Sequence, residues 1–272
     1  MMAKLIDKTG IPPGVVNIIT GDAENCGAPL TSHPMVERIS FTGGPDTARH
    51  VLRNSAANLA QTSLELGGKS PVVVFADADI NSVANAVVAG VFAACGQSCV
   101  SGSRLIVHRD IKEKLLAVLA KKAVAIKIGD PQDMATEMGP LATQAQLTHI
   151  EKVVADFTAM GANLICGGRR AAGFAGYYYE PTILDCSSVR APCVDIELFG
   201  PVLSVLSFSD EEEALQLAND TPYGLAAGVF TQNISCAHRM SKGIRAGIVW
   251  LNTYRAISPL ALFGGYGLSG LG

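Results

Sequence analysis

Short apolar runs alternate with longer segments of helical periodicity along this chain. The runs of strand length lie at 14–20, 36–41, 63–66, 71–75, 103–108, 163–168, 178–184, 201–208, 225–230 and 247–252. Helical patterns separate them at about 22–32, 45–59, 79–95, 111–125, 144–160, from 210 onward, and at 235–244. This alternation predicts an α/β fold built on mostly parallel sheets.

A pair of glycines suggests one domain boundary. Gly67 and Gly68 end one predicted strand just before another begins at Pro71. We therefore expect one domain over residues 1–67 and a second over residues 68–272. The first is short against the ~100–150 residues of a typical domain, so we expect it to be incomplete.

Composition narrows the class of protein. The chain has 272 residues, of which 49% are hydrophobic and 17% charged, so it is globular. The net charge of −3 and the lack of a basic run argue against binding to nucleic acid or to a membrane surface. The longest apolar run, Val83 to Cys95, is shorter than the ~20 residues of a membrane span. We expect a cytoplasmic protein that binds neither nucleic acid nor membranes.

Seven cysteines raise the question of which thiols carry chemistry. None forms a CxxC pair, so we expect reduced thiols and no metal site. For any one of them, burial in a core is the commoner role. Cys99 differs because it lies in GQSCVSGSR, where the backbone N–H groups of Gly96, Ser98, Ser101 and Gly102 could stabilise a thiolate or an oxyanion.

A nucleophilic cysteine needs a base, and the five histidines offer no suitable setting. They are interpreted as surface or satisfied polar positions. Glu65, in LELGGKSP, is the better candidate. It could be an outward-facing strand carboxylate, or it could occupy a partly apolar cleft in which desolvation raises its pKa toward neutrality. The residues alone leave both alternatives open.

LELGGKSP, GQSCVSGSR and ELFGPV together resemble the motifs of the NAD(P)-dependent aldehyde dehydrogenase superfamily. The intervals, 34 residues from Glu65 to Cys99 and 98 from Cys99 to Glu197, also resemble that family. Further similarity runs through PPGVVNIITG, FTGG, NDTPYGLAAGVFT, GIVWLNTY and FGGYGLSG, across essentially the whole chain. The resemblance implies an aldehyde-dehydrogenase-like catalytic domain with an incomplete Rossmann-like cofactor domain.

The resemblance also implies roles for individual residues. Cys99 would attack an aldehyde, forming a thiohemiacetal and then a thioester, and Glu65 would activate the water that hydrolyses it. NAD or NADP would accept the hydride. The implied cofactor contacts are Gly43, Gly44, Leu66, Glu197 and Phe199. The family usually has serine where this chain has Gly44, so one hydroxyl contact to phosphate is lost.

The chain departs from the family pattern in extent. Relative to that pattern it begins partway through the cofactor domain, and it lacks the segments with the family's oxyanion asparagine and adenosine-ribose lysine. We therefore expect weak or no turnover unless an N-terminal complement is supplied. Two alternatives remain open: a catalytically inactive fragment used for binding or assembly, and a cofactor-independent esterase.

The aldehyde itself is not specified by the sequence. The resemblance implies a pocket that includes Ser98, Val100 and the loop from Tyr254 to Leu262. Small semialdehydes or medium-sized aldehydes are favoured, and a solvated role for Arg255 is favoured over contact with an acidic substrate. Family members usually form homo-oligomers, but through a hairpin and tail that this chain lacks.

Overall fold

The computed structural model describes residues 1–189 and 196–272, so Cys193 lies outside the described residues. The chain divides into two compact units. Unit 1 comprises residues 1–41 and 46–63, and unit 2 comprises residues 42–45 and 64–272. The boundary expected between Gly67 and Gly68 concerns functional domains and stays a prediction.

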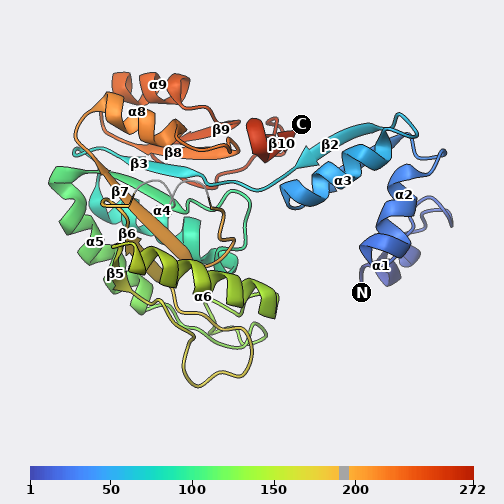
Figure 1. Ribbon diagram of the computed structural model, residues 1–272, viewed down its shortest axis with the longest axis horizontal. Helices are drawn as coiled ribbons and strands as arrows, with labels where there is room; N and C mark the ends of the chain where they lie inside the picture. Colours follow the sequence, from blue (N-terminus) through green and yellow to red (C-terminus); the bar gives the residue numbers. More distant parts are fainter. Residues whose placement is uncertain (190–195) are drawn as a thin grey trace. The chain divides into compact units, whose positions relative to one another are not determined.

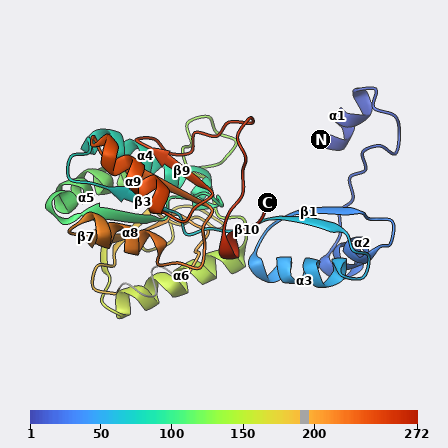
Figure 2. The same cartoon turned by 90° about the horizontal axis from the view of Figure 1, so that it is seen from above.

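Unit 1 contains short helices and a strand pair, and α3 runs alongside β1 and β2 in both views (Figure 1 and Figure 2). Its elements are α1 (Met2–Lys8), the π-helical turn η1 (Ala23–Gly27), α2 (Ala28–Ser32), β1 (Arg38–Thr42), α3 (Pro45–Ser55) and β2 (Gln61–Glu65). Four residues at the ends of these elements belong to unit 2, namely Thr42, Pro45, Leu64 and Glu65. The helix predicted over 22–32 is confirmed as η1 followed by α2. The sequence pattern missed α1.

The strand predicted over residues 14–20 is wrong. This segment has no regular structure, and most of its apolar side chains are exposed. A strand needs a neighbour that pairs with its backbone N–H and C=O groups, and no described strand pairs with this segment. Its apolar pattern therefore has no sheet to join among the residues that the structure describes.

Unit 2 is built on a seven-stranded sheet in the order β5-β6-β7-β4-β3-β8-β9. All neighbouring pairs are parallel except β5 with β6. The strands are β3 (Pro71–Val74), β4 (Arg104–His108), β5 (Asn163–Cys166), β6 (Thr182–Asp185), β7 (Val202–Phe208), β8 (Ala226–Phe230) and β9 (Ile248–Leu251). The predicted α/β class with a mainly parallel sheet is confirmed.

Helices cover both faces of this sheet, with α8 and α9 on one face and α4, α5 and α6 on the other (Figure 1). They are α4 (Ile80–Phe92), α5 (Arg109–Val124), α6 (Gln144–Ala159), α8 (Glu211–Asn219) and α9 (Ile234–Gly243). All five begin after a residue whose side chain accepts a hydrogen bond from the first turn, namely Asp79, His108, Thr143, Asp210 and Asn233. Sheet and helices enclose one continuous apolar core.

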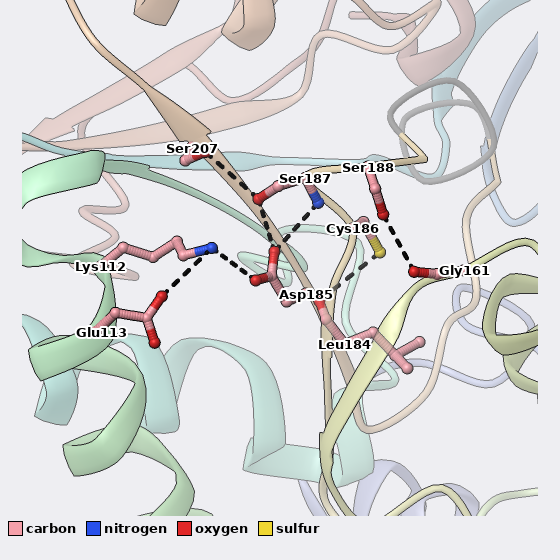
Figure 3. A network of polar contacts seen from close by, with 9 residues as sticks. All are labelled: Lys112, Glu113, Gly161, Leu184, Asp185, Cys186, Ser187, Ser188 and Ser207. Atoms are coloured by element: carbon pink, nitrogen blue, oxygen red, sulfur yellow. Dashed lines mark hydrogen bonds and ion pairs between the residues drawn. The ribbon is translucent and has the colours of Figure 1, made fainter.

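A network of hydrogen bonds surrounds Asp185, the last residue of β6 (Figure 3). Lys112 of α5 donates to Asp185 at 2.7 Å, and the backbone N–H and hydroxyl of Ser187 donate to the same carboxylate at 3.1 and 2.6 Å. Burial acts to raise the pKa of Asp185, but these hydrogen bonds outweigh it and lower the pKa. The carboxylate therefore ties α5 to the turn that follows β6.

Candidate active site

Unit 2 contains a cavity of about 660 Å³. Every residue that the sequence nominates for catalysis or cofactor contact lines it: Gly43, Gly44, Glu65, Leu66, Cys99, Glu197 and Phe199. They come from four separate stretches of the chain, so the fold brings together residues that are far apart in sequence. A cavity of this volume is in the range of small-molecule sites.

The loop before Cys99 turns sharply because three successive residues adopt left-handed conformations. Ala94, Cys95 and Gly96 have φ of 52°, 56° and 69°, so the helix predicted over 79–95 ends instead at Phe92. Such backbone is costly for residues other than glycine and gathers at functional sites. At Gly96 a Cβ would also overlap the carbonyl oxygen of Gly200, so the loop approaches the Glu197–Phe199 segment closely.

Cys99 is half-buried. Burial raises the pKa of its thiol, and the negative charges of Glu197 and Glu65 raise it further. The backbone N–H groups of Val100 and of Cys99 itself act in the opposite direction. The sulfur is therefore a neutral thiol at rest that needs a base to become a nucleophile.

The predicted N–H donors around Cys99 are largely wrong. The N–H of Ser98 donates to Gly96, that of Ser101 to Ser98, and that of Gly102 to Gly90, at 3.0, 2.9 and 3.3 Å. These three N–H groups are used by local backbone hydrogen bonds, so they are not free to stabilise the thiolate. The amino-acid composition of the loop could not predict which direction each N–H group takes. The backbone N–H groups that act to lower the pKa of the thiol are those of Val100 and of Cys99 itself.

Glu65 ends β2, and its backbone is held from two sides. Gly43 donates its N–H to the Glu65 carbonyl at 3.2 Å, and Gly270 of β10 (Gly270–Leu271), which follows the short helix η3 (Gly267–Ser269), pairs with Glu65 in antiparallel register. Burial raises the pKa of the Glu65 carboxyl. Its Oε2 atom is buried and has no hydrogen-bond partner within residues 1–189 and 196–272, so it is available to accept a proton.

The Gly67–Gly68 pair lies close to both the Glu197 carboxylate and the backbone of Cys99. The N–H of Gly68 donates to Glu197 Oε1 at 3.0 Å, and a Cβ at Gly67 would overlap the same carboxylate. A Cβ at Gly68 would lie 2.7 Å from the carbonyl oxygen of Cys99. Burial raises the pKa of Glu197, whereas Gly68 and Lys69 act to lower it. The two glycines therefore allow Glu197 and the Cys99 loop to approach the backbone of Gly67 and Gly68 closely.

Sequence reasoning missed several residues at this cavity, notably Gln97, Gln146 and His149. Gln146 of α6 donates to the carbonyls of Leu198 and Phe199, and Phe199 has φ of 44°. Gln97 accepts the N–H of Ala142, just before α6, at 2.9 Å. The capping residue Thr143 predicts where α6 begins, and Gln146 and His149 share one helical face, but local patterns do not say that this face meets the cavity.

Two other kinds of site receive no support from the described structure. Within residues 1–189 and 196–272, no group of three or more His, Cys, Asp or Glu side chains is arranged to hold a metal ion. In the same part of the chain, no helix has the length and apolar character needed to cross a membrane.

Comparison with known proteins shows extensive similarity. Residues 1–272 match the aldehyde dehydrogenase family. The chain is 62% identical over 271 residues to (Z)-2-((N-methylformamido)methylene)-5-hydroxybutyrolactone dehydrogenase of Acinetobacter baylyi, covering 99% of this chain and 55% of that protein. The chain spans about half the length of the curated relatives it matches.

Solved structures of other proteins are also similar to this chain. PnpE from Pseudomonas sp. WBC-3 superposes with a TM-score of 0.96 at 39% identity, covering 100% of this chain and 56% of that one. Betaine aldehyde dehydrogenase from Staphylococcus aureus, in complex with NAD+, gives a TM-score of 0.94 at 37% identity, covering 99% of this chain and 54% of that one. With its fold, its motifs and its full-length family match, the chain belongs to the aldehyde dehydrogenase family.

Proposed function

We propose that this chain carries the nucleophile, the base and the nicotinamide-ribose contacts of an NAD(P)-dependent aldehyde dehydrogenase. The observation that carries the proposal is the single cavity lined by Cys99, Glu65, Glu197 and Phe199. A thiol and a carboxylate in one cavity suffice for nucleophilic attack followed by hydrolysis. Relatives named as aldehyde dehydrogenases, one of them solved with NAD+, support this chemistry.

The residues present fit a nicotinamide cofactor. Glu197 offers carboxylate oxygens to ribose hydroxyls, and the N–H of Gly68 orients that carboxylate. Phe199 is 40% exposed, which leaves ring surface for an aromatic ligand. Gly43 and Gly44 line the cavity without side chains, and a Cβ at Gly44 would meet nothing within 4 Å. When bound, the cofactor supplies the acceptor for the hydride of the aldehyde carbon.

The chain's own residues would then act in two stages. In the first, Glu65 takes the Cys99 thiol proton, the sulfur bonds to the aldehyde carbon, and the Cys99 N–H stabilises the oxygen that becomes negative. Glu65 then releases that proton to solvent, and loss of the hydride from the former aldehyde carbon leaves a thioester. In the second stage, Glu65 takes a proton from water while the water oxygen bonds to the thioester carbon. The carbon–sulfur bond breaks, the carboxylic acid leaves, and the thiol is restored.

The test is an assay with NAD+ or NADP+ against a panel of aldehydes that includes betaine aldehyde and a small semialdehyde. We expect Cys99→Ser to lose at least about 10³-fold in rate. The matched control is Cys166→Ser, which changes another half-buried thiol outside the cavity and should keep the activity. Equal rates in wild type and Cys99→Ser would contradict the proposal.

We expect the chain by itself to turn over slowly, because among the described residues we assign one oxyanion donor, the Cys99 N–H. Loss of one such donor costs on the order of 10² to 10³ in rate. Addition of a separately produced N-terminal segment from a relative should raise the rate of the wild-type chain and leave Cys99→Ser inactive. A wild-type chain already working at a normal enzymatic rate would overturn this expectation.

A cofactor-independent esterase is a second candidate, favoured by the presence of Cys99 and Glu65 in the same cavity. Neither group needs a cofactor to acylate and deacylate an activated ester. Hydrolysis of p-nitrophenyl acetate that is lost in Cys99→Ser, without any aldehyde oxidation under the conditions above, would support this alternative.

A further inference from the structure

Tyr254, three residues after β9, fills a slot that three glycines leave open. A Cβ at Gly90 of α4 would lie 2.8 Å from its ring, one at Gly102 would lie 3.0 Å away, and one at Gly228 of β8 would lie 2.6 Å away. Real Cβ atoms do not approach other heavy atoms so closely without displacing them. Three elements that are distant in sequence thus lack side chains at the place where this ring inserts.

The loop that carries Tyr254 is held by its neighbours. Asn252 has φ of 53°, and its side chain exchanges hydrogen bonds with the backbone of Thr231 at 2.9 and 3.0 Å. The Trp250 ring meets the Tyr254 ring edge-on, with centroids 4.8 Å apart. The indole N–H of Trp250 donates to Ala256 at 2.8 Å, across the base of the loop. The tyrosine ring is therefore fixed by both its slot and its loop.

The phenol hydroxyl reaches the residue that follows the nucleophile. Tyr254 Oη donates to the carbonyl of Val100 at 3.0 Å. Burial raises the pKa of Tyr254 well above its usual value, so the hydroxyl remains a donor through the neutral and alkaline range. Val100 also supplies a backbone N–H that acts to lower the pKa of the Cys99 thiol. Its carbonyl is thus held by Tyr254 while its N–H stabilises the thiolate.

We propose that Tyr254 is a positioning residue for the nucleophile. By holding the Val100 carbonyl, it fixes the backbone of Val100 and keeps the Val100 N–H directed at the Cys99 sulfur. The proposal rests on the proposed role of Cys99 as the nucleophile. Tyr254 does not line the cavity, and its hydroxyl reaches the nucleophile loop through the Val100 carbonyl.

The variant Tyr254→Phe removes the hydroxyl group and keeps the aromatic ring. Phenylalanine has the same ring and fills the slot among Gly90, Gly102 and Gly228 equally well, so packing is kept. The hydroxyl's hydrogen bond to Val100 is lost, together with its interaction with the Ser70 side chain. Tyr178→Phe is the matched control: it also removes one phenol hydroxyl, keeps the ring that stacks on Phe174, and lies outside the cavity lining.

The experiment measures the rate at which iodoacetamide alkylates Cys99, as a function of pH, by mass spectrometry of the peptide that contains it. Tyr254→Phe should move the midpoint of the Cys99 profile to higher pH, because the thiolate loses a well-directed N–H donor. At neutral pH we expect alkylation to slow by about 3- to 10-fold, the range of one lost hydrogen bond. Cys166 in the same sample should react as in wild type.

Matching Cys99 profiles for wild type, Tyr178→Phe and Tyr254→Phe would overturn the positioning role. If Tyr254→Phe does not fold, Trp250→Phe carries the test, because it loosens the ring contact and keeps the hydroxyl. A smaller shift in the same direction then supports the proposal, and an unchanged profile overturns it.

Alkylation needs no turnover, so the two proposals fail separately. A shifted profile in a chain that shows no aldehyde oxidation even when the N-terminal segment of a relative is added contradicts the proposed function, and it leaves the effect of Tyr254 on the Cys99 thiol standing. Normal oxidation with an unchanged profile and an unchanged kcat in Tyr254→Phe contradicts the positioning role alone.

Discussion

Residues 15–19 in unit 1 and residues 71–74 in unit 2 are similar apolar stretches in opposite environments. In unit 1, Val15 is 67% exposed and Ile19 is 60% exposed. In unit 2, Val72 and Val73 are at most 1% exposed, because β3 pairs with β4 on one side and β8 on the other. An apolar run becomes a buried strand only where neighbouring strands satisfy its backbone and helices cover its faces.

The two units also differ in how many partners hold their polar side chains. In unit 2, buried or half-buried side chains such as Arg104 and Asp185 hold several backbone or side-chain partners each. In unit 1, the charged residues are largely exposed, and their contacts are short-range in sequence. We therefore expect substitutions of the same chemical kind to cost far more stability in unit 2 than in unit 1.

The largest difference should come from buried arginine. Arg104 is fully buried and donates to the carbonyls of Lys69, Leu217 and Ala218 at 2.7, 3.0 and 2.9 Å. Arg104→Met leaves these buried acceptors without their donor and should lower the free energy of unfolding by about 3–5 kcal/mol, as measured by urea denaturation. Arg53→Met, on the exposed face of α3 in unit 1, should change it by less than about 0.5 kcal/mol.

A smaller difference should separate the two apolar runs. Val73→Ala removes buried methyl groups from the centre of the sheet and should cost about 2–3 kcal/mol. Val16→Ala, in the exposed run of unit 1, should cost no more than about 0.5 kcal/mol. Thermal unfolding of the pair checks this prediction. Equal losses would mean that residues 15–19 are buried in solution, which would remove the contrast between the units.

The smallest expected effect concerns acid stability. The folded-state pKa of Asp185 lies below its ordinary 3.8, so its contribution is present above pH 3.8 and is lost as the pH falls through the lower folded-state value. Asp185→Asn should therefore flatten the decline in unfolding free energy below pH 5, by about 1 kcal/mol or less for a partly exposed pair. Urea denaturation at pH 5, 4 and 3 measures this slope.

Asp22 in unit 1 provides the counterpart. Hydrogen bonds from the backbone and side chain of Asn25 also lower its pKa, but its carboxyl is fully exposed. Asp22→Asn should change the acid slope less than Asp185→Asn does. An equal or larger change would show that burial does not decide the weight of these carboxylates.

Much of unit 2 could be predicted from sequence because its determinants are local. The apolar runs and the capping residues Asp79, Asp210 and Asn233 are visible in the chain, and three motifs at family-like intervals nominate Cys99, Glu65 and Glu197 as candidate site residues. The exposed run at 15–19 could not be predicted, because its apolar pattern does not reveal whether a partner strand is present.

The details that shape the site depend on contacts between distant segments. The left-handed backbone at Ala94 and Cys95 is stabilised by the surrounding fold, because neither residue favours it. Gln146 reaches Leu198, and Tyr254 enters a slot made by Gly90 and Gly228, across long separations in sequence. Periodicity and composition carry no information about such pairings, so these residues emerge only from the three-dimensional arrangement.

The central claim is that Cys99 and Glu65 act together, as nucleophile and base, in one cavity. Its most direct test is to mix Glu65→Gln with p-nitrophenyl acetate and map covalent acetyl groups by mass spectrometry, with Glu180→Gln as a carboxylate control outside the cavity. We predict one acetyl group on Cys99 that forms more slowly in Glu65→Gln, because the thiol has lost its base, but then persists there, whereas it turns over in wild type and in the control. An acetyl group on another cysteine, or equal deacylation with and without Glu65, would contradict the claim.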